Sequence, residues 1–387
     1  MFNILKLNEI SKQATKALDS NYSLSNDCAN PEAIILRSFD MHDYTTGSNL
    51  LAVVRAGAGV NNIPIEEMTA KQVAVFNTPG ANSNAVKELA ICALLLGSRK
   101  IVEGIEWTKS LNGKGDEVPA LVEKGKKAFV GGELKGKKLG VVGLGAIGRM
   151  VANTACDLGM EVLGYDPYLS IDGAWSLKEK VQHITSLNKI FTNCDYITLH
   201  VPMTDSTKNC INAETISLMK NDVVILNLAR GGLVNDDDII AALEKNEVGC
   251  YITDLPNEKL LNAKNCICIP HLGASTPEAE DNCATMAVFE LKEYLESGNI
   301  INSVNFPCVA APRSGAQRVT ILYKNVPNMI ATATKLFADA NINISNMVNS
   351  SKGDIAYMIL DLDSAISKDQ LDRLQAKDNF LLVRSFN

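Results

Sequence analysis

Three polar residues in the second half of the chain follow predicted strands and carry groups suited to oxidising an alcohol. Arg230 follows the run LNLA, Glu258 lies in the loop TDLPNEKLL, and His271 follows the run CICIP. Arginine can bind a carboxylate through two parallel N–H groups and stays charged at neutral pH. Histidine exchanges protons near neutral pH, and a nearby carboxylate favours its charged form and orients its ring. The set therefore suits a 2-hydroxy acid, whose carboxylate would be bound while its hydroxyl loses a proton.

A glycine-rich segment upstream of these residues indicates a dinucleotide. Residues 143–148 read GLGAIG, follow a predicted strand at 138–143 and begin a predicted helix at about 147–158. The next predicted strand ends in Asp166. In this order, glycines let the backbone approach the pyrophosphate and the helix N-terminus offers it N–H donors. Asp166 would accept hydrogen bonds from the adenosine ribose and repel a 2′-phosphate, so we expect NAD rather than NADP.

Each of these features has a structural alternative when it is taken alone. The glycine segment can be an ordinary tight turn with a surface aspartate. A single histidine at a strand end is more often structural, and an arginine or a glutamate in a loop lies on the surface by default. The order of arginine, glutamate and histidine behind a dinucleotide motif favours the catalytic interpretation.

A parallel sheet is needed to bring these residues together, and the middle of the chain has the spacing of βα units. Further strands are predicted at residues 196–201, 223–229, 250–254 and 267–269. Arg230, Glu258 and His271 then lie at or just past the carboxyl ends of strands, where ligands bind in open α/β sheets. The first part of the chain repeats the pattern more weakly, with strands predicted at 34–36, 52–54 and 73–76.

The composition is that of a globular protein of two or three domains, with 387 residues, 46% hydrophobic residues and a formal net charge of −7. The negative charge argues against nucleic-acid and anionic-membrane partners, and the absence of a long apolar run argues against a membrane span. The ten cysteines form no CxxC pair. We therefore expect reduced thiols, no metal site and a cytoplasmic location. Cys266 and Cys268 lie in a strand-like run, and we expect their side chains on opposite faces.

The segments GLGAIG, LHVPMT, LNLARGG and PHLGAST together resemble the D-isomer-specific 2-hydroxy acid dehydrogenase family. The resemblance implies two Rossmann- or flavodoxin-like parallel-sheet domains, an α/β fold, and a catalytic trio at Arg230, Glu258 and His271. One departure is the loop from Asp254 to Glu258, which is one residue shorter than the common family pattern. The implied cofactor contacts are Gly143, Gly145, Ala146, Ile147, Gly148, Asp166, His200, Pro202, Thr207, Ala229, Arg230, Asp254, His271, Gly273 and Ala274.

The resemblance also implies that the nucleotide domain is inserted into the substrate domain. We expect a discontinuous substrate-binding domain at residues 1–92 and 286–308 and an NAD-binding Rossmann domain at 93–285. A small-residue linker is predicted at 309–317 and a C-terminal βαββαβ unit at 318–387. The family further implies at least a dimer, so a homo-dimer or homo-tetramer is expected.

A phosphorylated substrate needs additional cations, and two arginines follow strands of the first domain. Each of Arg37 and Arg55 is more often structural when taken singly. The segments RAGAGVNNI and NTPGANS, however, resemble those of 3-phosphoglycerate dehydrogenases. That likeness implies NAD-dependent oxidation of 3-phospho-D-glycerate to 3-phosphohydroxypyruvate, the first step of L-serine biosynthesis. The implied substrate contacts are Arg37, Arg55, Ala58, Gly59, Asn82, Arg230 and His271.

The C-terminal unit resembles the ACT regulatory domain that many 3-phosphoglycerate dehydrogenases carry, where it can bind serine. Asn325 and Pro327 match its motif His-x-Asn-x-Pro-Gly, whereas Tyr323 and Asn328 replace the histidine and the glycine. Without that glycine, close approach of a ligand to the backbone is harder. We expect the fold to be kept, and both serine binding and a purely assembling role stay open.

Two other functions remain as alternatives. A glyoxylate or hydroxypyruvate reductase of the same family usually lacks the C-terminal unit and needs no phosphate-binding arginines. An NAD-responsive corepressor-type binding module shares the fold, but the intact arginine, glutamate and histidine set and the negative net charge argue against it.

Overall fold

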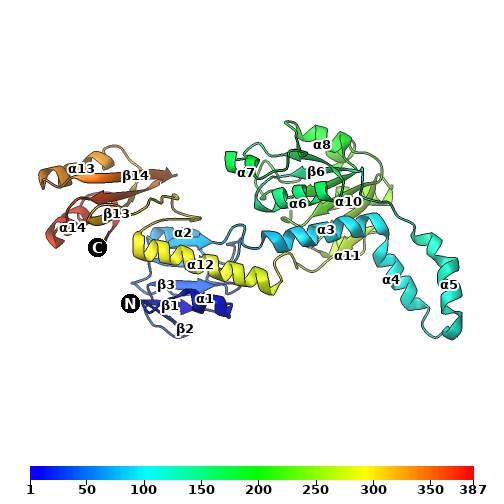
Figure 1. The fold of residues 1–387 in the computed structure, drawn as a ribbon, viewed down its shortest axis with the longest axis horizontal. Coiled ribbons are helices and arrows are strands. Elements are labelled where there is room, and N and C mark those ends of the chain that lie inside the picture. Colours follow the sequence, from blue (N-terminus) through cyan, green and yellow to red (C-terminus); the bar gives the residue numbers. More distant parts are fainter. The chain divides into compact units, whose positions relative to one another are not determined.

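The computed structural model describes residues 1–387 and forms two compact units, drawn in Figure 1. One unit comprises Met1–Asn82 with Pro277–Asn387, and the other comprises Ser83–Thr276. The expected fold class is confirmed, because two parallel sheets and one small antiparallel sheet are present. The domain boundaries given above stay predictions. No helix combines the length and the apolar character that crossing a membrane requires.

The first parallel sheet belongs to the unit that contains both chain ends. In spatial order its strands are β2 (Tyr22–Ser25), β1 (Phe2–Lys6), β3 (Ala33–Leu36), β4 (Ala52–Arg55) and β5 (Ala74–Asn77). The central strands are apolar and buried along almost their whole length, as expected for a sheet covered on both faces. Helices α1 (Lys12–Ala17) and α2 (Ile65–Ala70) connect strands, and α12 (Pro277–Ser297) packs its apolar side into the same core.

The second parallel sheet forms the centre of the other unit. Its strands, in spatial order, are β12 (Cys266–Cys268), β11 (Val248–Thr253), β10 (Val223–Asn227), β9 (Tyr196–Leu199), β6 (Lys138–Val142), β7 (Glu161–Tyr165) and β8 (Gln182–His183). The strand order reverses between β6 and β9, and ligands of doubly wound folds bind at such a reversal. A separate apolar core covers each face of this sheet.

Helices flank the second sheet and begin mostly at the carboxyl ends of its strands. They are α3 (Ser83–Arg99), α6 (Ala146–Asp157), α7 (Ile171–Trp175), α8 (Leu187–Asn193), α9 (Ala213–Ile216), α10 (Asp236–Glu244) and α11 (Glu258–Leu261). Between α3 and β6 the chain forms α4 (Ile101–Ser110), α5 (Val118–Gly125) and two short 3₁₀ turns, at Gly115–Glu117 and Lys126–Phe129. The sequence patterns assign no element to this last stretch.

The C-terminal segment forms the expected βαββαβ unit. Its elements are β13 (Gln317–Lys324), α13 (Met329–Asp339), β14 (Ile344–Lys352), β15 (Ile355–Leu362), α14 (Lys368–Gln375) and β16 (Phe380–Phe386). The antiparallel sheet has the order β14-β15-β13-β16. One face packs on α13 and α14. Leu322, Tyr357 and Ile359 on the other face join the core that contains α12, so this sheet is covered on both sides.

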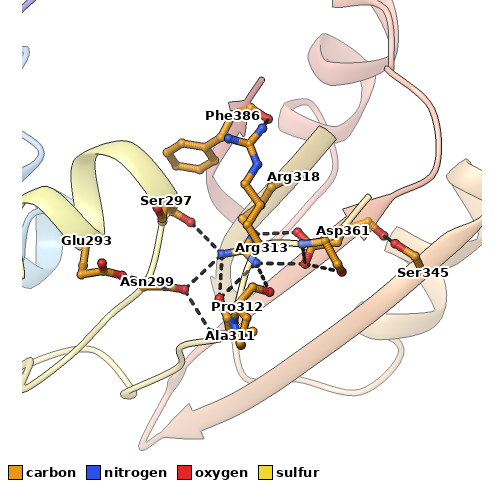
Figure 2. A network of polar contacts seen from close by, with 12 residues as sticks. Glu293, Ser297, Asn299, Ala311, Pro312, Arg313, Arg318, Ser345, Asp361 and Phe386 are labelled. Atoms are coloured by element: carbon orange, nitrogen blue, oxygen red, sulfur yellow. Dashed lines mark hydrogen bonds and ion pairs between the residues drawn. The ribbon is translucent and has the colours of Figure 1, made fainter. Parts of the chain in front are cut away.

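The predicted linker at residues 309–317 is held by a buried ion pair, which Figure 2 shows. Arg318 on β13 and Asp361 on β15 both have fully buried side chains, and Arg318 Nε lies 2.6 Å from Asp361 Oδ1. The guanidinium also donates to the backbone oxygens of Ala311 and Pro312 in the linker and of Ser297 at the end of α12. These bonds satisfy the buried charges, which would otherwise be costly. The linker is therefore fixed against the C-terminal sheet.

Cys266 and Cys268 correct one expectation from the sequence. Their sulfur atoms lie 3.8 Å apart on the edge strand β12. The prediction of opposite faces was wrong, because residues two positions apart in a strand point to the same face. All ten cysteines are free.

Candidate functional site

The turn between β6 and α6 contains three glycines, and a different physical constraint explains the glycine at each position. Gly143 has a φ of +92°, which favours glycine, and a Cβ there would lie 2.5 Å from the backbone oxygen of His200. A Cβ on Gly148 would lie 1.9 Å from the backbone oxygen of Gly143, so this glycine allows close packing inside the turn. Gly145, before Ala146 and Ile147 at the start of α6, faces open space. An open, glycine-lined helix N-terminus fits a pyrophosphate.

Asp166 lies directly after β7 and its carboxylate is held by the backbone. Oδ2 accepts a hydrogen bond from Leu144 N at 2.8 Å, and Oδ1 accepts one from Tyr168 N at 2.8 Å. Each oxygen keeps further acceptor capacity for a hydroxyl. A pocket of about 730 Å³, lined by Asp166, Leu144 and Ala174 among others, opens beside it. This arrangement fits the ribose and base of a dinucleotide.

His200 follows β9 and lies beneath the glycine turn. Its Nε2 atom is 3.0 Å from Thr198 Oγ1, whereas its Nδ1 atom is buried without a partner. Burial lowers the pKa of His200 to about 4, so the ring is neutral at physiological pH. In the loop that follows, the Thr207 hydroxyl donates to the backbone oxygen of Pro202 at 2.6 Å and closes a tight turn. The buried, unpaired nitrogen is a polar atom that a ligand in this part of the sheet can satisfy.

Arg230 lies in a loop that is held by side-chain hydrogen bonds, which the sequence did not predict. Buried Asn227, the last residue of β10, donates to the backbone oxygen of Arg230 at 2.9 Å and accepts from Ala229 N at 3.2 Å. The Arg230 side chain is exposed, and its Nη1 donates to the backbone oxygen of Ala229. The guanidinium therefore keeps most of its N–H donors for an anion. The only feature of the sequence that could have predicted these hydrogen bonds is an asparagine at the end of a strand.

Asp254 is an acidic residue whose pKa is affected by the charges of the predicted catalytic groups His271 and Arg230. It follows β11 with 2% of its surface exposed, and its Oδ1 atom has no hydrogen-bond partner. Burial raises the pKa of Asp254, whereas the charges of His271 and Arg230 and the N–H of Gly273 lower it, and the net direction is upward. The carboxyl of Asp254 is thus within electrostatic range of Arg230 and of His271.

Glu258 and His271 are both exposed. Glu258 is the first residue of α11, and Asn257 caps that helix by accepting from Lys259 N and Leu260 N. The loop from Asp254, which is one residue shorter than the common family pattern, thus ends where α11 begins, at Glu258. Gly273, after His271, is buried, and a Cβ on it would lie 3.4 Å from Asp254 Oδ2. The structure associates Arg230, His271 and Asp254, and it forms no hydrogen bond between the side chains of Glu258 and His271.

In the other unit, Arg37 follows β3, and Arg55 is the last residue of the neighbouring strand β4. Arg55 is paired in register with Leu36, and its Nε donates to the backbone oxygen of Arg37 at 2.9 Å. Arg55 Nη1 also donates to Asn61 Oδ1 at 3.3 Å. A Cβ on Gly59 would lie 2.8 Å from Arg55 Nη1, so glycine leaves room for the guanidinium. The two arginines therefore form one positive cluster at the carboxyl edge of the sheet.

The remaining predicted substrate contacts lie in the loops around this cluster. The backbone oxygen of Ala58 accepts a hydrogen bond from Asn77 Nδ2 at 2.5 Å. Asn82 lies directly before α3. Glu280 on α12 forms an ion pair with Arg37, which the sequence did not predict because the two residues are far apart along the chain.

Comparisons with known proteins found a matching family and several similar relatives. Residues 91–273 match the family described as D-isomer specific 2-hydroxyacid dehydrogenase, NAD binding domain. A D-3-phosphoglycerate dehydrogenase of Haemophilus influenzae is 30% identical over 354 residues, covering 87% of this chain and 81% of the relative. One of Escherichia coli K12 is 31% identical over 317 residues, covering 79% and 73%. The relative from Methanocaldococcus jannaschii is 34% identical over 319 residues, which cover 81% of this chain, but this chain spans only 57% of that protein's length.

Solved structures give the same result. The NAD⁺-bound 3-phosphoglycerate dehydrogenase of Entamoeba histolytica superposes with a TM-score of 0.61 at 25% identity, covering 79% of this chain and 98% of that one. A glyoxylate reductase with a TM-score of 0.65 is only 22% identical and shows the shared fold alone. These matches show that the chain belongs to the D-isomer specific 2-hydroxyacid dehydrogenase family.

Proposed function

We propose that this chain catalyses the NAD-dependent oxidation of 3-phospho-D-glycerate to 3-phosphohydroxypyruvate, the first step of L-serine biosynthesis. The observation that carries the proposal is that Arg37 and Arg55 lie at the carboxyl ends of neighbouring strands, where Arg55 Nε donates to the backbone oxygen of Arg37. A 2-hydroxy acid without a phosphate needs no such cluster in addition to Arg230. Guanidinium groups bind phosphate oxygens through charge-assisted hydrogen bonds, so two of them suit a phosphorylated acid.

The chain's residues divide the work by chemical type. Arg230 binds the substrate carboxylate, and Arg37 and Arg55 bind the phosphate. His271 accepts the proton of the C2 hydroxyl as general base, which leaves a carbonyl at C2 once the hydride has departed. NAD, when bound at the glycine turn and Asp166, supplies the hydride acceptor. A carboxylate beside His271 stabilises the imidazolium that forms, and the proposed candidates are Glu258, from the family resemblance, and Asp254.

The decisive experiment follows NADH oxidation by the purified protein with 3-phosphohydroxypyruvate, hydroxypyruvate and glyoxylate in parallel. A strong preference for the phosphorylated acid supports the proposed substrate. Preference for hydroxypyruvate or glyoxylate keeps the family and removes the phosphate role of Arg37 and Arg55. Inactivity on all three, with NADH still bound, supports an NAD-responsive binding module instead.

Further proposals concern the partners and the location. We propose a homo-dimer or homo-tetramer, to be measured by light scattering, and a cytoplasmic location, which the ten free cysteines support. Serine is a proposed ligand of the C-terminal unit because Asn325 and Pro327 match the ACT motif. Against it, the Asn325 side chain already donates to the backbone oxygen of Gly353 at 3.0 Å. A serine titration of the reductase rate decides between inhibition and a purely assembling unit.

A further inference from the structure

The positive cluster of Arg37 and Arg55 has an acidic partner on α12. Glu280, in the first turns of that helix, forms an ion pair with Arg37. The side chains of Arg37 and Glu280 are 34% and 42% exposed. Glu280 therefore lies at the solvent-accessible side of the cluster, where an arriving anion would also meet Arg37.

Hydrogen bonds and an ion pair hold the two arginines of the cluster. Arg55 donates to the backbone oxygen of Arg37 and to Asn61. The guanidinium of Arg37 has a charged partner, Glu280. Burial raises the pKa of the Cys283 thiol, also on α12, and the charges of Arg37, Glu280 and Arg55 have smaller effects on it. Glu280 is thus an acidic partner of the cluster, supplied by α12.

We propose that Glu280 is a specificity-determining residue that competes with the substrate phosphate for Arg37. The inference rests on the proposed function, since it assigns the phosphate to this cluster. In the free protein the Glu280 carboxylate occupies Arg37, and the phosphate of the substrate displaces it or shares the guanidinium with it. Glu280 acts through Arg37 and takes no part in the chemistry at C2.

Charge explains why such a competitor would discriminate between anions. A phosphate monoester carries a charge of about −1.5 to −2 at pH 7, whereas a carboxylate carries −1. Because the ion pair is more than a third exposed on its acidic side, it is weak enough for a phosphate to displace. A substrate carboxylate has the same charge as Glu280 and gains nothing by replacing it. Glu280 would therefore keep the carboxylate end of the substrate, and unphosphorylated acids, away from Arg37.

The test compares the wild type with Glu280→Gln, which keeps the shape and removes the charge. We expect KM for 3-phosphohydroxypyruvate to fall about fivefold, with kcat and the KM for hydroxypyruvate unchanged. The matched control is Glu278→Gln, because Glu278 is an exposed acid on the same helix turn and forms no ion pair. Melting temperatures of all three proteins verify folding. An unchanged or higher KM for the phosphorylated acid in Glu280→Gln overturns the proposal.

Calorimetric titration with inorganic phosphate provides a readout that needs no turnover. Glu280→Gln should bind phosphate about fivefold more tightly than the wild type and the control variant. Equal or weaker binding, or no measurable binding by Glu280→Gln, contradicts the role of Glu280. If the wild type fails to reduce 3-phosphohydroxypyruvate, the proposed function falls, while the phosphate titration still decides whether Glu280 competes for Arg37.

Discussion

At Asp254 a buried carboxyl with an unpaired oxygen interacts with the charges of His271 and Arg230. Family resemblance assigns the partner carboxylate of His271 to Glu258, which is exposed at the start of α11. A carboxylate close to an imidazolium stabilises it more strongly when water is excluded from the carboxylate. Asp254 and Glu258 are therefore two candidate partners of His271, and they should affect the same proton transfer to different extents.

We predict that Asp254→Asn and Glu258→Gln both move the acid limb of the pH profile of kcat/KM to lower pH. Removing a carboxylate destabilises the protonated base, so the base is neutral at a lower pH. The shift should be larger for Asp254→Asn, because Asp254 is buried and its carboxyl interacts with the charge of His271. His271→Ala, which should lose turnover by about two or more orders of magnitude, serves as the reference for loss of the base. A shift confined to Glu258→Gln would instead support the assignment from the family.

In the turn before α6, one glycine is required for packing and another for cofactor binding. Gly148 allows close packing within the turn, whereas Gly145 faces open space at the start of the helix. The same substitution at the two positions should therefore have different consequences, although both residues belong to one motif.

We predict that Gly145→Ala keeps the wild-type melting temperature but weakens NADH binding, measured by fluorescence, by at least tenfold. The added methyl group has nothing to contact in the protein and lies where the cofactor approaches. Gly148→Ala should lower both the melting temperature and the affinity, because its Cβ would lie 1.9 Å from the Gly143 oxygen. Equal melting temperatures for the two variants would disprove this division.

The C-terminal strands are joined to the linker by the pair of Arg318 and Asp361 (Figure 2). Burial alone would raise the pKa of Asp361, but hydrogen bonds and the charge of Arg318 reverse this, and its pKa lies below the usual value of 3.8. A carboxyl with a lowered pKa stabilises the fold at neutral pH. That contribution declines as the pH falls below the unfolded value and through the folded one.

We predict that Arg318→Met lowers the free energy of unfolding at pH 7 by about 3 kcal/mol, because it leaves a buried carboxylate without its partner. Urea unfolding at pH 7 and at pH 3 measures the effect, which should be smaller at pH 3, where Asp361 is partly protonated without its cation. Arg313→Met is the control, because Arg313 donates a single hydrogen bond, to the Phe386 oxygen. An equal decrease in the free energy of unfolding in the two variants would show that the ion pair contributes no more to stability than a single hydrogen bond.

At the scale of the whole molecule, the two compact units hold different predicted contacts. Residues proposed to bind NAD lie in Ser83–Thr276, whereas Arg37, Arg55 and Glu280 lie in the unit with both chain ends. Cofactor affinity and phosphate recognition should therefore respond separately to substitution.

We predict that Arg55→Ala lowers kcat/KM for 3-phosphohydroxypyruvate by about 10- to 100-fold, as expected for loss of a charged hydrogen-bond donor. The value for hydroxypyruvate and the affinity for NADH should change little. Arg373→Ala is the control, since Arg373 lies exposed on α14 and pairs with Asp369. Similar losses on both substrates would refute a phosphate role for Arg55.

Local patterns in the sequence determined a large part of this protein. The glycine spacing at 143–148, the buried apolar strands and the βαββαβ order of the C-terminal unit each depend on neighbours along the chain, so the sequence alone predicts them. The same holds for Arg37 and Arg55, because carboxyl ends of adjacent parallel strands lie at one edge of a sheet.

Only the tertiary structure decided which groups face one another across long sequence separations. Glu280 reaches Arg37, Asp361 reaches Arg318, and Asp254 interacts with His271 because sheets and helices bring their elements together. No periodicity encodes such pairings. Burial, which sets the strength and direction of the Asp254 and Asp361 interactions, is likewise a property of the packed molecule, since it depends on every element that excludes water from a side chain.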